Sequence, residues 1–256
     1  MTHLSSPLNL KKSLGQHFLK DEAVCQRIVD TLRQFPFNQL LEIGPGAGAL
    51  TKYLLAMEGI TFRAVEIDRE KVTYLKRQFP SIADKIIETD FLEMEKPFEG
   101  PFTIIGNFPY NISTEILFKI LEWREDVERV TGMFQKEVAQ RIASIEGNKI
   151  YGVTSVLLQA YFEVEYLFEV SELAFSPPPK VKSAVIRLTP RKEPPPVRTE
   201  KMFFTLVKTA FNQRRKTLRN AVKGLFTDET LLDPLFNKRA EQLTIREFTD
   251  LTWRMK

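Results

Sequence analysis

Asn107, Phe108, Pro109 and Tyr110 directly follow an apolar run at residues 102–105 that is typical of a buried strand. Their types suit one chemical task, which is to hold an exocyclic base amine whose lone pair is delocalised into the ring. The Asn side-chain carbonyl and the backbone carbonyl before the proline can accept hydrogen bonds from that amine, while the aromatic ring stacks on the base. The segment therefore indicates methyl transfer to a base amine, and an ordinary Asn-Pro turn is the alternative.

A glycine-rich turn lies earlier in the chain, where residues 42–48 read Glu-Ile-Gly-Pro-Gly-Ala-Gly. Gly44 and Gly46 let the backbone approach a ligand where a Cβ would collide. The spacing differs from the Gly-x-Gly-x-x-Gly of nicotinamide-binding folds. Glu42 would repel a pyrophosphate, but it can pair with the amine of a methionine-like group.

Three acidic residues end three successive predicted strands: Glu42, Glu66 and Asp90. In an open parallel sheet the carboxyl ends of the strands line the crevice that binds ligands. Glu66 sits where an acid can hold two ribose hydroxyls, and Asp90 can accept from a cofactor adenine amine. Together they favour S-adenosylmethionine over NAD, although each acid taken alone could be a solvated or helix-capping carboxylate.

Strands and helices alternate over the first two-thirds of the chain. This pattern predicts an α/β fold with a Rossmann-like, mostly parallel sheet. Residues 164–170 and 183–188 follow without a helix of usual length between them, which indicates an antiparallel hairpin at the sheet edge. The predicted strands are 40–43, 62–67, 85–89, 102–106 and 129–134, and the predicted helices are 50–57, 70–79, 114–123, 138–144 and 151–162.

The pattern changes at the polar, proline-rich segment 191–196, which is typical of a linker. Helices are predicted after it at 203–211, 216–226, 229–236 and 245–255, and Thr244 with Glu247 predicts a capping box for the last. We therefore expect a methyltransferase catalytic domain at 1–192 and a small all-helical, RNA-contacting domain at 193–256.

The composition is that of a globular protein, with 43% hydrophobic and 27% charged residues among 256. The sequence predicts no membrane span and no signal peptide, so a cytoplasmic location is expected. The single Cys25 with His3 and His17 excludes a disulfide framework and a Cys/His zinc site, and no metal is expected. A monomer is expected because no long hydrophobic seam is evident.

The net charge of +4 is distributed unevenly. Residues 191–256 hold 15 basic and 8 acidic residues, a net charge of +7, and no acid lies between Lys201 and Lys223. A solvated helix face explains such a run as well as nucleic-acid binding does. Its combination with a base-handling segment favours nucleic acid.

Taken together, these motifs resemble the KsgA/RsmA family, the small-subunit (16S) ribosomal RNA adenine N6,N6-dimethyltransferases. The resemblance covers roughly residues 10–220. His17 stands where the family pattern has Asn, and Phe108 where Leu is usual. The matching segments, in family order, are 12–19, 42–48, Glu66 with Asp68, Asp90, 107–113, 175–184 and 211–216.

The resemblance implies transfer of methyl groups from S-adenosylmethionine to N6 of two adjacent adenines, leaving S-adenosylhomocysteine. The adenines lie in the hairpin loop near the 3′ end of 16S rRNA and become N6,N6-dimethyladenosines during small-subunit biogenesis. Asn107 and the Phe108 carbonyl would hold the amine, and Tyr110 would stack on the adenine. Phe175 would cover its other face, with a core position at a strand end as the alternative for this residue. The N-terminal segment with His17 and Leu19 would close over the cofactor.

The basic residues near the end of the chain are candidates for gripping the RNA backbone. A solvated surface is the alternative for each of them. The candidates are Lys180, Lys208, Arg214, Arg215, Lys216, Arg219 and Lys223.

Four other functions compete with this interpretation. A large-subunit rRNA methyltransferase of the macrolide-resistance group shares the glycine turn and the Asn-x-Pro-Tyr segment, but fits segments 175–184 and 213–216 less well. A DNA adenine methylase would need a separate base-recognition domain. A non-catalytic assembly or transcription factor on the same scaffold would be expected to lose the cofactor acids, and an NAD-dependent oxidoreductase has the wrong glycine spacing.

Overall fold

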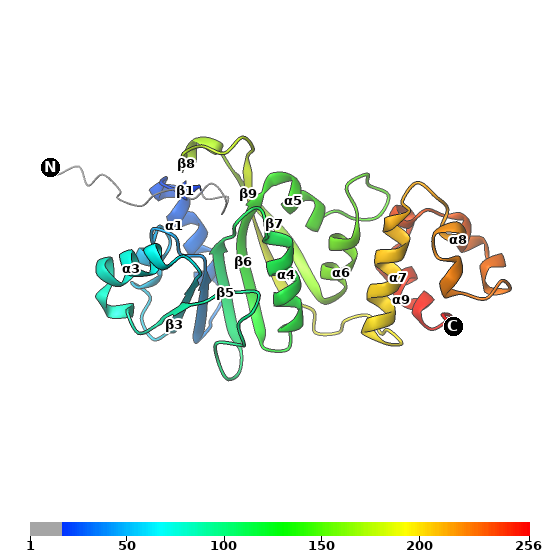
Figure 1. Cartoon of the computed structure of the whole chain (residues 1–256), viewed down its shortest axis with the longest axis horizontal. Coiled ribbons are helices and arrows are strands. Elements are labelled where there is room, and N and C mark those ends of the chain that lie inside the picture. Colours follow the sequence, from blue (N-terminus) through cyan, green and yellow to red (C-terminus); the bar gives the residue numbers. More distant parts are fainter. Residues whose placement is uncertain (1–16) are drawn as a thin grey trace. The chain divides into compact units, whose positions relative to one another are not determined.

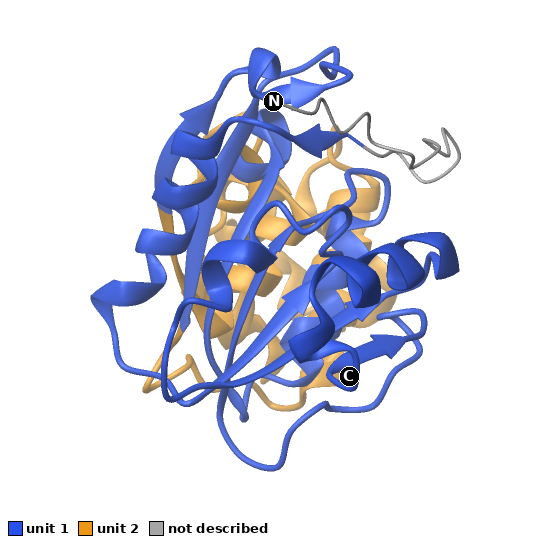
Figure 2. Cartoon of the chain, turned by 90° about the vertical axis from the view of Figure 1, so that its left-hand side faces the viewer, with its two compact units in different colours: residues 1–139, 166–189 blue, residues 140–165, 190–256 orange. Residues whose placement is uncertain are grey.

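The computed structural model describes residues 17–256 and divides the chain into two compact units (Figures 1 and 2). The first unit comprises the described residues up to Ala139 together with Tyr166–Thr189. The second comprises Gln140–Glu165 and Pro190–Lys256. The predicted N-terminal segment before His17 lies outside the described residues.

A seven-stranded sheet, which belongs to the first unit except for residues 162–165 of β7 and the last residue of β9, has the order β4-β3-β2-β5-β6-β9-β7. Neighbouring strands from β4 to β6 are parallel, whereas β9 runs antiparallel to β6. The predicted α/β fold with a mostly parallel sheet is confirmed. The strands are β2 (Gln39–Ile43), β3 (Thr61–Glu66), β4 (Ile86–Glu88), β5 (Phe102–Asn107), β6 (Val127–Gln135), β7 (Phe162–Val170) and β9 (Ser183–Pro190).

The central strands are apolar because both faces of the sheet are covered. Leu40, Leu41, Ile104 and Ile105 are completely buried. Leu41 pairs with Ile104 in register across β2 and β5. This parallel register brings the carboxyl ends of the strands to one edge, where the sequence places its polar residues.

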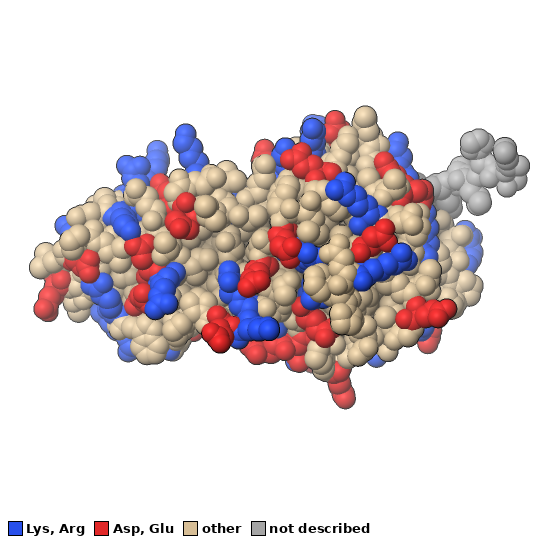
Figure 3. All heavy atoms as spheres, turned by 180° about the vertical axis from the view of Figure 1, so that it is seen from behind, with Lys and Arg blue, Asp and Glu red and all other residues tan. Residues whose placement is uncertain are grey.

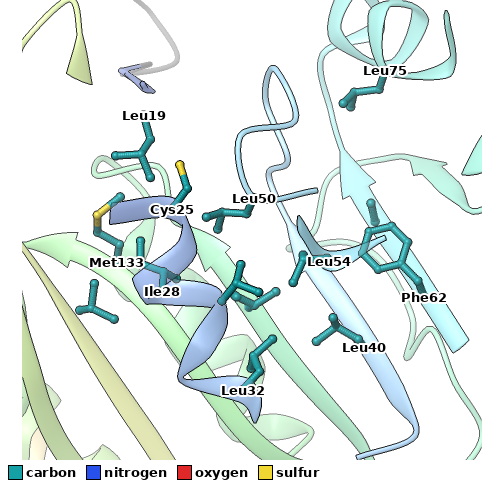
Figure 4. Packing of buried hydrophobic residues seen from close by; sticks show 14 of the residues in the cluster. Leu19, Cys25, Ile28, Leu32, Leu40, Leu50, Leu54, Phe62, Leu75 and Met133 are labelled. Atoms are coloured by element: carbon teal, nitrogen blue, oxygen red, sulfur yellow. The ribbon is translucent and has the colours of Figure 1, made fainter. Parts of the chain in front are cut away.

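Five helices follow or flank these strands. Asp21 accepts a hydrogen bond from the Val24 amide at the start of α1, and Asp68 accepts one from the Glu70 amide at the start of α3. Figure 4 shows Cys25, Ile28 and Leu32 packed in the core around α1. The helices are α1 (Glu22–Asp30), α2 (Thr51–Leu54), α3 (Arg69–Gln78), α4 (Ser113–Glu122) and α5 (Lys136–Ile142).

The second unit is helical and is built around α7 (Glu200–Asn212), against which α6 (Val153–Tyr161) and α9 (Ile245–Thr252) pack. Aromatic pairs hold it together: the ring centroids of Tyr161 and Phe203 lie 6.4 Å apart. The predicted capping box of Thr244 and Glu247 is present at α9. Because α6 packs on α7, the compact units assign residues 140–165 to the helical part, and they do not coincide with the predicted division at residue 192.

Two helices predicted in the second unit are shorter than expected. Residues 216–226 form only α8 (Leu218–Ala221) and a 3₁₀ turn at Lys223–Leu225. Residues 229–236 form two 3₁₀ turns, the second of which starts at Pro234. Gly224 and Pro234 lower helix propensity here, so tight turns replace continuous helices.

None of the helices within residues 17–256 has the length and apolar character needed to cross a membrane.

Candidate functional site

A pocket of about 260 Å³ opens at the carboxyl ends of β2, β3 and β5, entirely within the first unit. Its named lining residues are far apart in the sequence, from His17 to Tyr110. Every predicted cofactor-binding residue lines it, as does the whole segment 107–110. These lining residues are His17, Leu19, Glu42, Gly44, Gly46, Glu66, Asp90, Asn107, Phe108, Pro109 and Tyr110.

The glycine turn between β2 and α2 forms one wall of the pocket. Gly44, Gly46 and Gly48 all have positive φ values, between 60° and 85°, where side chains cause strain. The Gly44 amide donates to the Val65 carbonyl at 2.9 Å, which fixes the turn against β3. A Cβ on Gly44 would meet only Pro109 at 3.9 Å, so the backbone itself lies open toward the pocket.

Glu42 is 1% exposed and lines the pocket at the end of β2. The Thr51 hydroxyl donates to its carboxylate at 2.7 Å. The pKa of Glu42 is raised to about 8, chiefly by burial; the Thr51 hydrogen bond lowers it and the nearby Glu66 carboxylate adds a smaller increase. A ligand cation beside this carboxyl would stabilise its ionised form.

Glu66 ends β3 and is held rigidly by the backbone. The Gly46 amide donates to one carboxylate oxygen at 3.2 Å and the Asp68 amide to the other at 3.0 Å. Each oxygen keeps further acceptor capacity. The carboxylate is therefore positioned to accept from two neighbouring hydroxyls at once.

Asp90 follows β4 by two residues and is oriented by the Leu92 amide, which donates to Oδ1 at 2.9 Å. Phe91 and Leu92 line the pocket beside it. A carboxylate acceptor next to apolar side chains suits a flat heteroaromatic ring that carries an amine.

Phe108 explains why the segment after β5 turns toward the pocket. Its side chain is 1% exposed and packs on Phe134 with a centroid distance of 5.0 Å. A Cβ on Gly106 or on Gly132 would come within 2.6 Å of the Phe108 ring. The two glycines therefore leave room for Phe at this position, and the buried ring anchors the backbone between Asn107 and Pro109.

Tyr110 is oriented by neighbours on both sides. Its hydroxyl is 2.5 Å from the Ser183 hydroxyl on β9, and its ring stacks on His17 at 6.0 Å with an interplanar angle of 28°. Burial raises the pKa of Tyr110, so the hydroxyl stays protonated at neutral pH. His17 Nδ1 is in turn 2.9 Å from the Pro177 carbonyl.

The structure does not bring Phe175 to the pocket. β1 (Phe18–Leu19) pairs antiparallel with β8 (Phe175–Ser176), and Leu19 opposes Phe175. Phe175 is 0% exposed and belongs to the core cluster with Leu19 and Cys25. The predicted stacking of Phe175 on a base does not fit this burial, because the ring has no exposed face.

The predicted RNA-binding residues lie outside the pocket. Lys180 is exposed on the first unit, while Lys208, Arg215, Lys216 and Lys223 are exposed on the second. Arg214 and Arg219 are half-buried. Arg214 is engaged within its own unit: it lies 3.8 Å from Glu241 and donates to the Asn148 carbonyl at 3.5 Å.

The sequence did not single out several pocket residues. Phe18, Ile67, Phe91 and Leu92 give the pocket apolar walls, and Lys71 is buried at its edge with its ammonium 5.5 Å from the Phe18 ring. Apolar residues carry no chemical signature in a sequence. Their one available signal is position, since Ile67 and Phe91 directly follow the predicted acids Glu66 and Asp90.

The pocket suits S-adenosylmethionine by the chemistry of its side chains. Carboxylates at Glu42, Glu66 and Asp90 can meet an ammonium, a ribose diol and an adenine amine, while the apolar walls cover ring and methylene groups. The open glycine turn allows close backbone contact.

Comparison with known proteins agrees with this assignment. The profile of the family described as ribosomal RNA adenine dimethylase matches residues 8–254. A relative from Cytophaga hutchinsonii, named ribosomal RNA small subunit methyltransferase A, is 54% identical over 94% of this chain and 95% of its own length. The protein of the same name from Flavobacterium johnsoniae is 52% identical over 96% and 95%, respectively.

Solved structures share the fold. A dimethyladenosine transferase from Plasmodium falciparum superposes with a TM-score of 0.75 at 23% identity, covering 92% of this chain and 96% of its own. The 23S rRNA methyltransferase ErmE gives a TM-score of 0.67 at 27% identity, covering 91% and 99%.

Proposed function

Because this chain belongs to the ribosomal RNA adenine dimethylase family, we propose that it methylates N6 of two adjacent adenines in 16S rRNA. The adenines would lie in the loop of the 3′-terminal hairpin and receive two methyl groups each during small-subunit biogenesis. The observation that carries the proposal is that one pocket contains both the three acids and the segment Asn107–Tyr110.

The residues at the end of β5 position the target base. The Asn107 side-chain oxygen and the Phe108 carbonyl accept from the two hydrogens of the amine, which aims its lone pair into the pocket. Tyr110, fixed by Ser183 and His17, stacks on the ring of the extruded adenine. S-adenosylmethionine, when bound, supplies an electrophilic methyl group on a sulfonium.

No strong base is needed in this arrangement. The nucleophile is a neutral amine, and positive charge disperses as the methyl group is transferred. Orientation and electrostatics therefore account for most of the rate. The acceptors at Asn107 and Phe108 also stabilise the positive charge that grows on the amine.

Exposed basic residues would hold the RNA around the extruded base. Loop adenines can be splayed out and stacked, and flanking phosphates suit Lys and Arg side chains. We assign this role to Lys180, Lys208, Arg215, Lys216 and Lys223, which are exposed, with Arg214 and Arg219 as supporting residues. A monomer acting in the cytoplasm is part of this proposal.

The test is incubation of the protein with labelled S-adenosylmethionine and separately purified, undermethylated small and large ribosomal subunits. We expect label in two adjacent adenines of small-subunit RNA. Label only in large-subunit RNA would overturn the substrate. Label in neither, with cofactor binding intact, would overturn catalysis in favour of a scaffold role.

A further inference from the structure

A second, smaller pocket lies beside the candidate active site. It has a volume of about 210 Å³ and is lined by Gln135, Lys136, Glu137, Val181 and Lys182. All five residues belong to the first unit. They come from the end of β6, the start of α5 and the residues just before β9.

Strand pairing places this pocket next to the target-base position. Asn107 pairs with Met133 across β5 and β6, so Gln135 lies two residues further along β6 at the same edge of the sheet. Gln135 pairs with Ser183 across β6 and β9. Since the Ser183 hydroxyl is 2.5 Å from the Tyr110 hydroxyl, only one residue separates Tyr110 from the wall of the second pocket.

The charges of the pocket favour a neutral occupant. Lys136 Nζ pairs with Glu169 at 2.7 Å, and its backbone amide donates to the Lys182 carbonyl at 2.9 Å. The lining holds Lys136, Lys182 and Glu137, and Glu169 pairs with Lys136, so two cationic and two carboxylate side chains balance one another here. A bare phosphate would gain little from such a balanced site.

Gln135 and Val181 can recognise a base. The amide of Gln135 is half-buried and makes no side-chain hydrogen bond within residues 17–256. It offers one acceptor and two donors, which match the amine and the neighbouring ring nitrogen of adenine. Val181 is 39% exposed and provides an apolar surface for the face of a ring.

We propose that this second pocket holds the adenine next to the target adenine while the target occupies the active site. The inference rests on the proposed function, because it takes two adjacent adenines as the substrate. Gln135 reads the edge of the neighbouring base, Val181 covers its face, and Lys182 lies at the rim toward the sugar-phosphate backbone.

The test is a double-mutant cycle between the protein and the RNA. Small subunits are reconstituted with RNA that carries one target adenine and, on its 5′ or 3′ side, either adenine or an abasic sugar. We expect the abasic sugar on one side to lower kcat/KM of the wild-type protein about tenfold or more. Gln135→Ala should lose a similar factor on intact RNA and then be insensitive to the abasic substitution.

The outcomes separate this inference from the proposed function. Equal sensitivity of the wild-type protein and Gln135→Ala to the abasic sugar would overturn the second pocket. So would an effect of Lys182→Ala without any effect of Gln135→Ala, because a phosphate would then be the occupant. A wild-type protein that methylates neither particle would instead contradict the proposed function. Gln78→Ala and Lys85→Ala change exposed side chains elsewhere on the first unit and serve as matched controls.

Discussion

At the scale of single residues, Asn107 and Glu42 have different proposed roles: Asn107 holds the target amine, and Glu42 pairs with the ammonium of the cofactor. Asn107 ends β5 beside the buried Phe108, whereas Glu42 is the second-last residue of β2, just before the glycine turn. Both line the same pocket. The two roles can be separated experimentally because one concerns the rate of transfer and the other concerns binding of a cation.

Replacing Asn107 by Ala should abolish methyl transfer, because the target amine loses its side-chain acceptor. Cofactor affinity should stay within about tenfold, a change below ~1.4 kcal/mol. Single-turnover transfer of label and calorimetric titration with S-adenosylhomocysteine measure the two effects. Asn38→Ala, an exposed Asn just before β2, is the matched control. Normal turnover in the Asn107 variant would end its catalytic assignment.

The pKa of Glu42 predicts that cofactor binding depends on pH. At neutral pH its carboxyl is mostly protonated in the free protein, since the pKa is about 8. A bound ammonium favours the carboxylate and lowers that pKa, so binding releases a proton. Affinity should therefore rise from about pH 6 to pH 8, by at most tenfold per pH unit.

Titration of cofactor affinity against pH, in the wild-type protein and in Glu42→Gln, checks this linkage. The variant cannot ionise at this position, so its profile should be flatter. Titration of the cofactor's own amine also contributes to the pH dependence of affinity, but it does so equally in both proteins. Identical slopes would mean that Glu42 does not meet the ammonium.

At the scale of elements, two glycines with positive φ differ in the space around them. Gly48 has φ +85°, and a Cβ there would lie 2.5 Å from the Phe79 ring. Gly59 has φ +76°, but nothing lies within 4 Å of its added Cβ. Replacing each of these two glycines by Ala therefore separates the free-energy cost of an unfavourable backbone conformation from the cost of a steric collision.

Gly59→Ala should cost about 1–2 kcal/mol of unfolding free energy through its backbone conformation alone. Gly48→Ala should cost a further 1–3 kcal/mol, because Phe79 and the end of α3 must move. Denaturant unfolding gives both values from the shift in midpoint. Equal losses in the two variants would show that Phe79 relaxes without cost.

The strands that carry the site could be predicted from the sequence because each is a short, largely apolar run with a polar residue at or next to its end. β2, β3 and β5 begin and end within one residue of their predicted bounds. The acids Glu42, Glu66 and Asp90 follow from this, since parallel strands must end at one edge.

Elements whose form depends on tertiary packing could not be predicted in the same way. The pattern did not reveal α1, whose buried residues belong to the same core cluster as Leu40 and Met133 from distant strands. Phe175 lies shortly before three prolines, and the sequence leaves open whether it stacks on a base or belongs to the core, whereas the structure pairs it with Leu19 and buries it. A strand of two residues is too short to show a hydrophobic pattern, so its pairing partner could not be predicted from the sequence.

At the scale of the whole molecule, one face of the surface carries charges of both signs. Figure 3 shows Lys and Arg side chains interspersed with Asp and Glu over the visible face. A net charge of +4 therefore does not by itself define where RNA binds. The assignment of the basic residues after 200 to RNA binding rests on their exposure, which Lys208, Arg215, Lys216 and Lys223 share.

Arg215 and Lys216 are exposed, whereas Arg214 also supports the loop at Asn148 through its carbonyl contact. Each Lys or Arg that neutralises a phosphate releases counterions and contributes about 0.7–0.9 to the slope of log affinity against log salt concentration. Replacing Arg215 and Lys216 by Ala should therefore reduce the magnitude of that slope by about 1.4–1.8 and weaken RNA binding.

The matched control is the variant with Lys76→Ala and Lys85→Ala, which removes the same charge from the first unit and should leave the slope unchanged. RNA titrations over a range of salt concentrations compare both variants with the wild-type protein. A wild-type slope in the Arg215 and Lys216 variant would remove both residues from the interface.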